Sequence, residues 1–569
     1  MQANPVSSPR HQAPPEHQLG DPGLRLLRAV HGYLIGPLQT STFGHKRLGA
    51  SSFPLQHKPS PSVLQSTRPA QDMSVDLHNL RDQAAKAVVP NIKPNDITSK
   101  LGNLSKGLDI WTYLEDPVTV ELVFRGSHHS VTRDYTSNFS TSDSLTHVEF
   151  GLADETADLF VKVAGATIKQ FSIEVGVILP SLDTDIPPVR DGASIRAQGY
   201  AISIGIYENI SIGQRHQLFL NVTKLHTDWM GTLPGYCPFW VLCLPGAHDA
   251  GCNTLEGLDE IGNNLNLLAP FLAAFKLSVL TGLDDVTTQM SVSTWEKFVI
   301  WLGGLTQKDT TTAMLEMGTR FFDFRPGFSV QPLPALGMTE IRHQHAVVPG
   351  QQWKDFLVEI FQFLAAHPKE IVQVSVTSNG FVNSAMVPSA SDLAQVMSEA
   401  RQVAGVGASI GCVGPEVFSQ TLDQLWSSNN RLILTDSNHG PGISNLDAWN
   451  PTAWATVDPQ TLKDAYIAAL TPNNQIGKDE TVYQAQGTAT DKLKGPAVLL
   501  ANDYNLPLVR TKGNFNAVLL PYIRDVHSST LNHKEHLVLL DDWVDGCLTD
   551  VAISITLDRL GRMDKFVPN

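Results

Sequence analysis

The sequence predicts an α/β protein: a (β/α)8 TIM-type barrel, preceded by an all-β, sandwich-like domain and a disordered tail. Three observations support this prediction. Proline, serine and glutamine are dense up to residue 75, short alternating runs rich in β-branched residues follow, and from about residue 235 apolar runs alternate with amphipathic helical patterns. Strands that alternate with helices are typical of parallel α/β folds, because each crossover helix covers the sheet.

Residues 1–75 are predicted to form the tail. They contain ten prolines, and proline removes a backbone donor and fixes φ, so this composition disfavours a packed core. One periodic patch, residues 24–35, predicts a short helix.

Residues 76–232 are predicted to form a β-sandwich-like domain of unknown role, after a short helix at 80–88. Turn residues separate its alternating runs, as expected for an antiparallel sandwich. The expected strands are 118–124, 147–152, 159–163, 173–177, 201–207 and 217–222.

Residues 233–569 are predicted to form the barrel. Helices are expected at 353–367 and 391–404, and the apolar residues of the first recur at the spacing of one helix face. The expected parallel strands are 239–244, 319–324, 340–347, 371–376, 431–435, 481–486 and 537–540.

Charge and composition exclude several classes of protein. The net charge is −15, and an acidic surface repels nucleic-acid phosphates, so no nucleic-acid partner is expected. No apolar stretch is long enough to cross a membrane. Five cysteines without a CxxC pair predict buried thiols, neither a disulfide framework nor a zinc site.

The N-terminal region lacks the order of charge, apolar run and cleavage site of a signal peptide. We therefore expect a location in the cytoplasm or at the periphery of a membrane. Secretion by another route and a mitochondrial transit peptide remain open, since the start of the chain is poor in acidic residues and contains arginine and serine.

Polar residues at the ends of the predicted strands are the candidates for chemistry, because catalytic residues of such barrels lie at the carboxyl ends of strands. Two histidines, carboxylates and an arginine at one mouth could split a phosphodiester. One histidine removes a proton, the other supplies one, and arginine stabilises the developing charge. The candidates are His248, Asp249, Asp323, Arg325, His343, His345, Asp541 and Asp542.

Three segments carry a resemblance to a known family. They read Leu-Pro-Gly-Ala-His-Asp-Ala-Gly at 244–251, Gly-Thr-Arg-Phe-Phe-Asp-Phe-Arg at 318–325, and Ala-His-Pro-Lys-Glu-Ile-Val at 366–372. Together they resemble the X-domain of phosphatidylinositol-specific phospholipases C, and the bacterial and fungal enzymes more than the calcium-dependent animal enzymes. The resemblance covers residues 235–560.

The resemblance implies roles for individual residues. His248 would be the general base that deprotonates the inositol 2-hydroxyl, and His345 the general acid for the diacylglycerol oxygen. Asp249 would hold the second histidine. The end of the last strand, Asp541 or Asp542, would supply the partner of His248, and Asp542 is preferred.

Arg325 would contact the phosphate, with Asp323 beside it. Calcium-dependent relatives carry an acidic residue at the position of Arg325, where a guanidinium would repel a cation. The resemblance therefore implies no metal and no cofactor. A competing hypothesis is a cation site made of Asp249, Asp323 and Asp542, since hard cations favour carboxylate oxygens.

The chain departs from the family where the headgroup is bound. No lysine follows the strand at 371–376, no arginine follows the strand at 431–435, and Ala346 stands where relatives usually have glycine. Substrate contacts are then expected from other groups: Asp323, Asp436, Asn438 and His343. His343 could instead be a histidine with a purely structural role.

We therefore predict a metal-independent phosphodiesterase of the phospholipase C type that acts on a phospholipid or another phosphodiester. An apolar segment at 265–275 could contact a membrane or pack on the barrel. The alternatives are an altered, lipid- or glycan-binding relative and a phosphodiesterase for a non-inositol substrate.

Overall fold

A computed structural model of the chain describes residues 107–563 with internal gaps, of which the longest are 257–304 and 488–505. The predicted tail, the helices at 24–35 and 80–88, and the apolar segment at 265–275 lie outside the described residues. The bounds of the three predicted domains stay predictions.

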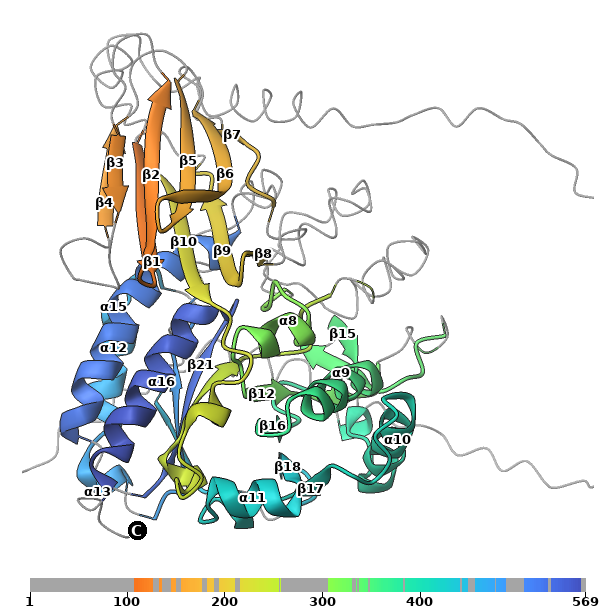
Figure 1. Cartoon of the computed structure of the whole chain (residues 1–569). Coiled ribbons are helices and arrows are strands. Elements are labelled where there is room, and N and C mark those ends of the chain that lie inside the picture. Colours follow the sequence, from red (N-terminus) through yellow and green to blue (C-terminus); the bar gives the residue numbers. More distant parts are fainter. Residues whose placement is uncertain are drawn as a thin grey trace, which may run out of the picture. The chain divides into compact units, whose positions relative to one another are not determined.

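Two five-stranded sheets form the first part of the described chain (Figure 1). One has the order β4 (Leu145–Glu149), β1 (Gly107–Leu114), β10 (His216–Lys224), β9 (Tyr200–Tyr207), β8 (Ile195–Ala197). The other has the order β3 (Thr132–Tyr135), β2 (Val118–Arg125), β5 (Glu155–Val163), β6 (Ala166–Val175), β7 (Leu182–Thr184).

Both sheets contribute to one apolar core, since alternate residues of each strand point inward: Ile110, Leu122 and Ile173 are buried in it. The pairs are antiparallel except β1 with β10, which run parallel. Each of the six predicted strand segments overlaps an observed strand. The prediction missed β1, β3, β7 and β8; three of these have only three or four residues, too few for a visible alternation.

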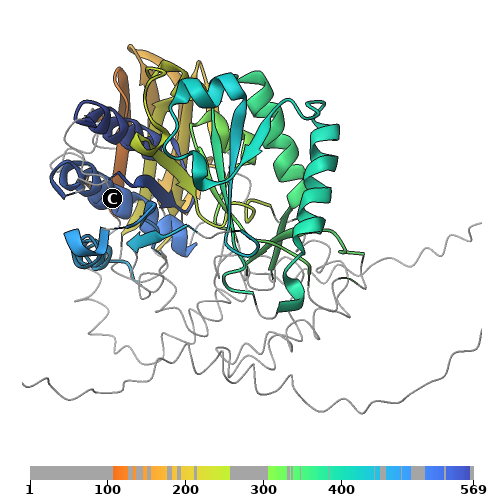
Figure 2. The same ribbon diagram turned by 90° about the horizontal axis from the view of Figure 1, so that it is seen from below.

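The second part is a curled, eight-stranded parallel sheet with helices packed on it (Figures 1 and 2). Its order is β17 (Gly411–Val413), β18 (Asn430–Asp436), β16 (Val372–Val376), β12 (Phe321–Phe324), β11 (Cys243–Ala247), β21 (His536–Asp541), β20 (Glu480–Gln484), β19 (Asn445–Ala448). The first and last strands along this part of the chain, β11 and β21, are therefore neighbours.

The predicted closed barrel is found only in part. Within the described ranges no pairing joins β17 to β19, so the sheet is a half-barrel. The strand β17 precedes β18 in sequence and pairs with the edge of β18 that faces away from β16. It therefore occupies the edge with which a strand that closed the barrel would have to pair.

Two predicted strands are corrected. The run 340–347 is not a strand of the parallel sheet: β14 (Arg342–His345) pairs antiparallel with β13 (Pro326–Gly327) and β15 (Val348–Gln352). The reason is the two-residue connection between β14 and β15, which can join only antiparallel strands. In the run 239–244, Phe239–Val241 forms a 3-10 turn and β11 begins after it.

Helices cover the outside of the parallel sheet. Those at 353–367 and 391–404 are confirmed as α9 (Trp353–Ala366) and α10 (Ala390–Val403). The apolar face of α9 is buried, and Ser389 and Asp392 form a capping box at the start of α10. The others are α8 (Thr311–Glu316), α11 (Leu422–Ser428), α12 (Gln460–Ala469), α13 (Pro472–Gln475), α15 (Pro507–Thr530) and α16 (Gly546–Leu560).

The two-sheet part packs against α15 and α16. Hydrogen bonds cross this contact: Asn221 Nδ2 of β10 donates to Asp545 Oδ2 at 2.7 Å, and the Tyr113 hydroxyl of β1 donates to Asp550 Oδ2 at 2.8 Å. The first of these is buried, so the contact involves the interior of the protein and not only its surface.

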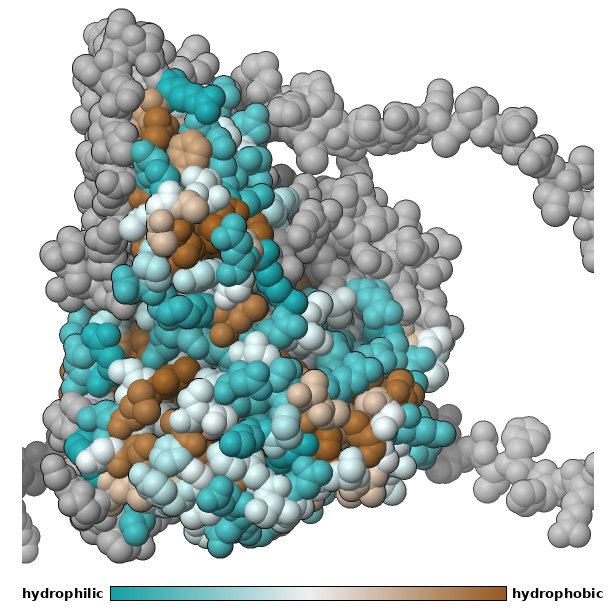
Figure 3. All heavy atoms as spheres, in the orientation of Figure 1, coloured by the Kyte–Doolittle hydropathy of each residue, from teal (hydrophilic) through white to brown (hydrophobic). Residues whose placement is uncertain are grey.

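The surface shown in Figure 3 carries hydrophobic side chains in small groups among hydrophilic ones. The large hydrophobic residues that are most exposed in the described part come from separate elements: Tyr236, Val403, Ile467 and Leu557. None of the described helices is both long and apolar enough to cross a membrane. Four cysteines are buried, one is partly buried, and none forms a disulfide, as predicted.

Candidate active site

His248 lies at the carboxyl end of β11, next to the carboxyl end of β21. The register pairs Ala247 with Asp541, so the residues that follow the two strands meet at one edge of the sheet. His248 Nδ1 is 2.8 Å from Asp542 Oδ1. Of the two aspartates at this strand end, the resemblance favoured Asp542 as the partner, and Asp542 is the one that makes this contact.

Arg325 follows β12, the neighbour of β11 on the other side. Its guanidinium contacts Asp323 Oδ2 at 2.9 Å and Asp249 Oδ1 at 2.9 Å, and its Nη2 lies 3.2 Å from His248 Nε2. The positive charge therefore sits between two carboxylates and directly beside one imidazole.

The Asp249 carboxylate lies at the centre of the group. Its Oδ2 is 3.4 Å from His248 Nε2 and 3.7 Å from His345 Nε2, and its Oδ1 is 3.4 Å from His343 Nε2. The backbone of Asp249 has a φ of 43°, in the left-handed region that few residues other than glycine adopt. Backbone strain of this kind is common at functional sites.

Two glycines allow β14 and β15, the antiparallel pair that carries His343 and His345, to lie close to the loop after β11. A Cβ at Gly251 would lie 2.3 Å from the Cβ of His343, and one at Gly350 would lie 2.1 Å from the carbonyl oxygen of Gly251. Neither position can carry a side chain without a shift of the backbone, so the two glycines set the distance between His343 and the loop.

His343 and His345 both point from β14 toward Asp249, but they differ in exposure. His343 is fully buried, and its Nδ1 accepts a hydrogen bond from the backbone amide of Arg325 at 3.1 Å. Its proton must therefore be on Nε2, which faces Asp249. The side chain of His345 is 34% exposed and is the one open to a substrate.

The charges around His248 favour its protonated form. Burial by itself lowers the pKa of His248, but Asp249 and Asp542 outweigh burial and raise this pKa to about 9. Burial by itself raises the pKa of Asp249, but Arg325 and His248 hold it well below its usual range. The site thus pairs an imidazolium with an aspartate that stays ionised.

The other two imidazoles behave in the opposite way. Burial lowers the pKa of His343 and of His345, and the nearby Asp249 does not compensate for it fully. The two candidate catalytic histidines, His248 and His345, are therefore shifted in opposite directions.

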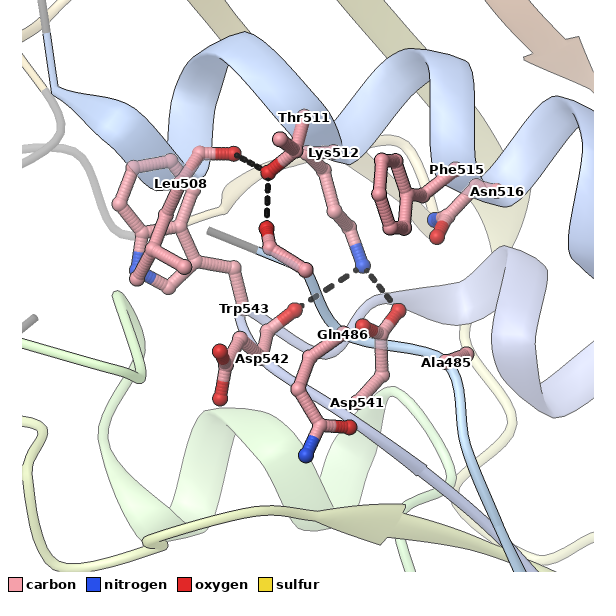
Figure 4. A pocket seen from close by; sticks show the side chains of 11 residues that line it. Ala485, Gln486, Leu508, Thr511, Lys512, Phe515, Asn516, Asp541, Asp542 and Trp543 are labelled. Atoms are coloured by element: carbon pink, nitrogen blue, oxygen red, sulfur yellow. Dashed lines mark hydrogen bonds and ion pairs between the residues drawn. The ribbon is translucent and has the colours of Figure 1, made fainter. Parts of the chain in front are cut away.

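Lys512 is a residue of this region that sequence reasoning missed. Its Nζ donates to Asp541 Oδ2 at 2.7 Å and to the carbonyl oxygen of Asp542 at 3.2 Å, as Figure 4 shows. Asp541 is thus engaged by Lys512 and Asp542 by His248. Strand-end reasoning could not find Lys512, because it lies inside α15 and is buried there.

Among the described residues, no contact joins Asp436 or Asn438 to the histidines of the site, His248, His343 and His345. The Asp436 carboxylate accepts the backbone amides of Asn438 and His439, and Asn438 Oδ1 accepts from the Ser378 hydroxyl at 2.8 Å. Asp436 also lines a cavity of about 330 Å³ with side chains of α10 and with Leu434. Its predicted contact with a headgroup stays a prediction.

The carboxylates also bear on the question of a metal. His248, Asp249 and Asp323 each offer a ligand atom close enough to the others to hold one ion, and such oxygens suit Ca²⁺ or Mg²⁺. The guanidinium of Arg325, however, already binds both aspartates. A cation would have to displace it, so the residues present do not fit a metal while Arg325 is in place.

Comparison with known proteins gives partial sequence matches. No family model matches the chain. PI-PLC X domain-containing protein 1 of Danio rerio is 22% identical over 246 residues, which are 42% of this chain and 70% of the relative. PI-PLC X domain-containing protein 2 of Homo sapiens is 28% identical over 150 residues, which are 26% of this chain and only 42% of the relative.

Solved structures of two bacterial enzymes are also similar. A point variant of the phosphatidylinositol-specific phospholipase C from Staphylococcus aureus aligns with 14% identity and a TM-score of 0.35, over 58% of this chain and 96% of that one. The enzyme from Listeria monocytogenes aligns with 13% identity and a TM-score of 0.33, over 58% and 98%.

The protein is of the α/β class, with a polar site at the ends of its strands. Histidines, aspartates and an arginine lie together at the carboxyl edge of its curled parallel sheet. Within this class, the chain is similar in part of its sequence to the PI-PLC X domain-containing proteins described above.

Proposed function

We propose that the protein is a phosphodiesterase of the phospholipase C type, which cleaves a phospholipid headgroup by acid–base catalysis with His248 and His345 and requires no metal. One observation carries the proposal: both imidazoles face the same Asp249 carboxylate, and the Arg325 guanidinium lies against that carboxylate and His248. A phosphate bound beside Arg325 would have a proton acceptor and a proton donor within reach.

The proposed reaction proceeds in one displacement. His248 takes the proton of a headgroup hydroxyl, whose oxygen attacks phosphorus. The bond from phosphorus to the diacylglycerol oxygen breaks, and His345 protonates that oxygen as it leaves. Arg325 stabilises the extra negative charge on the phosphoryl oxygens. With an inositol headgroup the product is a cyclic phosphodiester, and the second product is diacylglycerol.

The protonation of the two histidines determines how much of the protein is in the form that this scheme requires. With a pKa of about 9, His248 carries a proton at neutral pH and only a small fraction is free to act as a base. His345, whose pKa is lowered, is mostly neutral and not ready to act as an acid. The active form under these roles is thus a minor one near neutrality.

Arg325 also supports the absence of a metal requirement. It supplies fixed positive charge at the place where a Lewis acid would act, and it is held there by Asp249 and Asp323. This part of the proposal can be tested separately from the reaction type.

Product analysis with phosphatidylinositol vesicles, with and without a chelator, tests both parts. We expect a cyclic inositol phosphate and diacylglycerol in both conditions. Product that forms only when Ca²⁺ is added would contradict metal independence. If none of the phosphodiesters offered yields a product, the protein is better described as an altered relative that binds lipid or glycan.

A second candidate function is the hydrolysis of a non-inositol phosphodiester. It is favoured by the absence of any lysine or arginine in 377–380 after β16 and in 437–440 after β18, where the resemblance leads us to expect headgroup contacts. Comparison of phosphatidylinositol with other phosphodiester lipids at equal surface concentration would decide. A strong preference for phosphatidylinositol would exclude this candidate.

We also propose that residues 76–232 form one β-sandwich domain and that residues 233–569 form the catalytic domain. The common apolar core of the two five-stranded sheets supports the first, and the connected parallel sheet supports the second. Contact with a membrane at the periphery is part of the proposal, because the expected substrate is a lipid.

A further inference from the structure

Lys512 is a buried cation that takes no part in the proposed proton transfers. Its side chain is 3% exposed, and its Nζ lies 2.7 Å from Asp541 Oδ2 and 3.8 Å from Asp545 Oδ2. A buried charge is tolerated only where its partners are well placed, so the positions of lysine and aspartates depend on one another. The same Nζ donates to the carbonyl oxygen of Asp542, the residue that holds His248.

The aspartate on the far side of Lys512 is held by the two-sheet part. Asp545 caps α16, since its Oδ1 accepts from the backbone amide of Cys547 at 3.2 Å. Its Oδ2 accepts from Asn221 Nδ2 of β10 at 2.7 Å, in a buried hydrogen bond between residues 324 positions apart. A continuous series of contacts thus runs from Asn221 through Asp545 and Lys512 to Asp542.

A second series of contacts reaches the same pair from the segment before α8. The Gln307 side-chain amide donates to the carbonyl oxygens of His248 at 2.8 Å and of Asp541 at 3.0 Å. Two residues later, Asp309 accepts a hydrogen bond from the Ser194 hydroxyl, just before β8, at 2.9 Å. The backbones of His248 and Asp541 are therefore held by a side chain that lies two residues before one bonded to Ser194.

We propose that Lys512 is a positioning residue that holds Asp542 against His248, and that Asn221 of the two-sheet part completes this support through Asp545. The two-sheet part is then needed for the geometry of the acid–base site, in addition to any binding role of its own. The consequence for turnover rests on the proposed function, but the geometric claim does not.

The test measures the titration of His248 by NMR in the full chain, with its resonance assigned by comparison with His248→Gln. In Lys512→Met, we expect loss of the Asp542 contact to lower the His248 pKa by one unit or more from about 9. In Asn221→Ala, we expect a smaller shift in the same direction. The kcat should fall on the order of tenfold in Lys512→Met with KM nearly unchanged, the size of effect known for supporting groups.

Two control variants separate positioning from general loss of stability. Arg320→Met removes another buried ion pair, that of Arg320 with Glu370 at 2.8 Å near the start of β12. Tyr113→Phe removes a different hydrogen bond between the two-sheet part and α16. Both should leave the titration of His248 as in the parent chain.

An unchanged His248 titration in folded Lys512→Met would overturn the proposal. If that variant does not fold, Lys512→Arg and Asn221→Ala decide in the same way, and an unchanged titration in both overturns it. A parent chain without turnover in which these variants still shift the His248 titration would contradict the proposed function and support the positioning role.

Discussion

His248 Nδ1 and Asp542 Oδ1 lie 2.8 Å apart although 294 residues separate them in sequence. The contact forms because β11 and β21 are adjacent and parallel, so that their carboxyl ends reach the same edge. It fixes the orientation of the imidazole and leaves Nε2 directed at Asp249 and Arg325. The predictions below follow from this arrangement.

Removal of either candidate catalytic histidine should abolish turnover while the fold survives. We expect His248→Ala and His345→Ala each to lower kcat by about 10²- to 10⁴-fold, the usual contribution of a general acid or base. Product formation and circular dichroism check activity and fold. His367→Ala, which changes a histidine bonded to Asp228, is the matched control, and near-normal turnover in both site variants would refute the proposed chemistry.

The pH dependence of kcat/KM should be bell-shaped. Its acidic limb should follow the lowered pKa of His345 and its alkaline limb the pKa of about 9 at His248. Asp542→Asn removes a negative charge that stabilises the imidazolium, so it should lower the upper of the two values and narrow the bell from the alkaline side. An upper limb that does not move in Asp542→Asn would argue against His248 as its source.

Arg325 should be essential, and chelators should have no effect on the parent chain. We expect Arg325→Ala to lower kcat by roughly 10²- to 10³-fold, as found when a donor to a developing oxyanion is lost. Arg325→Lys should recover part of this, because an ammonium keeps the charge but not the forked contact with Asp249 and Asp323. Assays with added Ca²⁺ provide the check: full activity of Arg325→Ala in Ca²⁺ would show that the carboxylates can use a metal instead.

Glu480 should make stability fall as pH rises. Burial raises its pKa from 4.5 to about 7, and the hydrogen bond from Gln373 offsets this only in part. Between pH 4.5 and about pH 7 the folded state binds more protons than the unfolded state. The free energy of unfolding therefore decreases as the pH rises through this range, by at most roughly 3 kcal/mol. Glu480→Gln should therefore unfold at a higher temperature than the parent at pH 8 and show a smaller gain at pH 5.

Calorimetry at the two pH values measures this difference, and Glu340→Gln, an exposed substitution of the same kind, is the control. A gain for Glu480→Gln that does not depend on pH would show that the carboxyl group is not the cause.

Much of the architecture could be predicted from local patterns. The apolar face of α9 and the capping box of α10 are properties of short segments, and both helices were found within one residue of the expected ends. The strand-end rule also selected His248, Arg325 and Asp542, because a polar residue after an apolar run is visible without any tertiary information. The run with His343 and His345 was assigned to the wrong sheet, since apolar periodicity does not reveal the direction of the partner strand.

The sequence by itself determined which elements form and which residue types stand at the ends of the central strands, since periodicity, capping and turn chemistry act over a few residues. Only the tertiary structure decided how His248 and Asp542 meet, that Arg325 joins Asp249 to Asp323, and that Lys512 reaches Asp541 from α15. The physical reason is that these contacts join parts of the chain distant in sequence, and their strength depends on burial and on neighbouring charges, which exist only once the chain is folded.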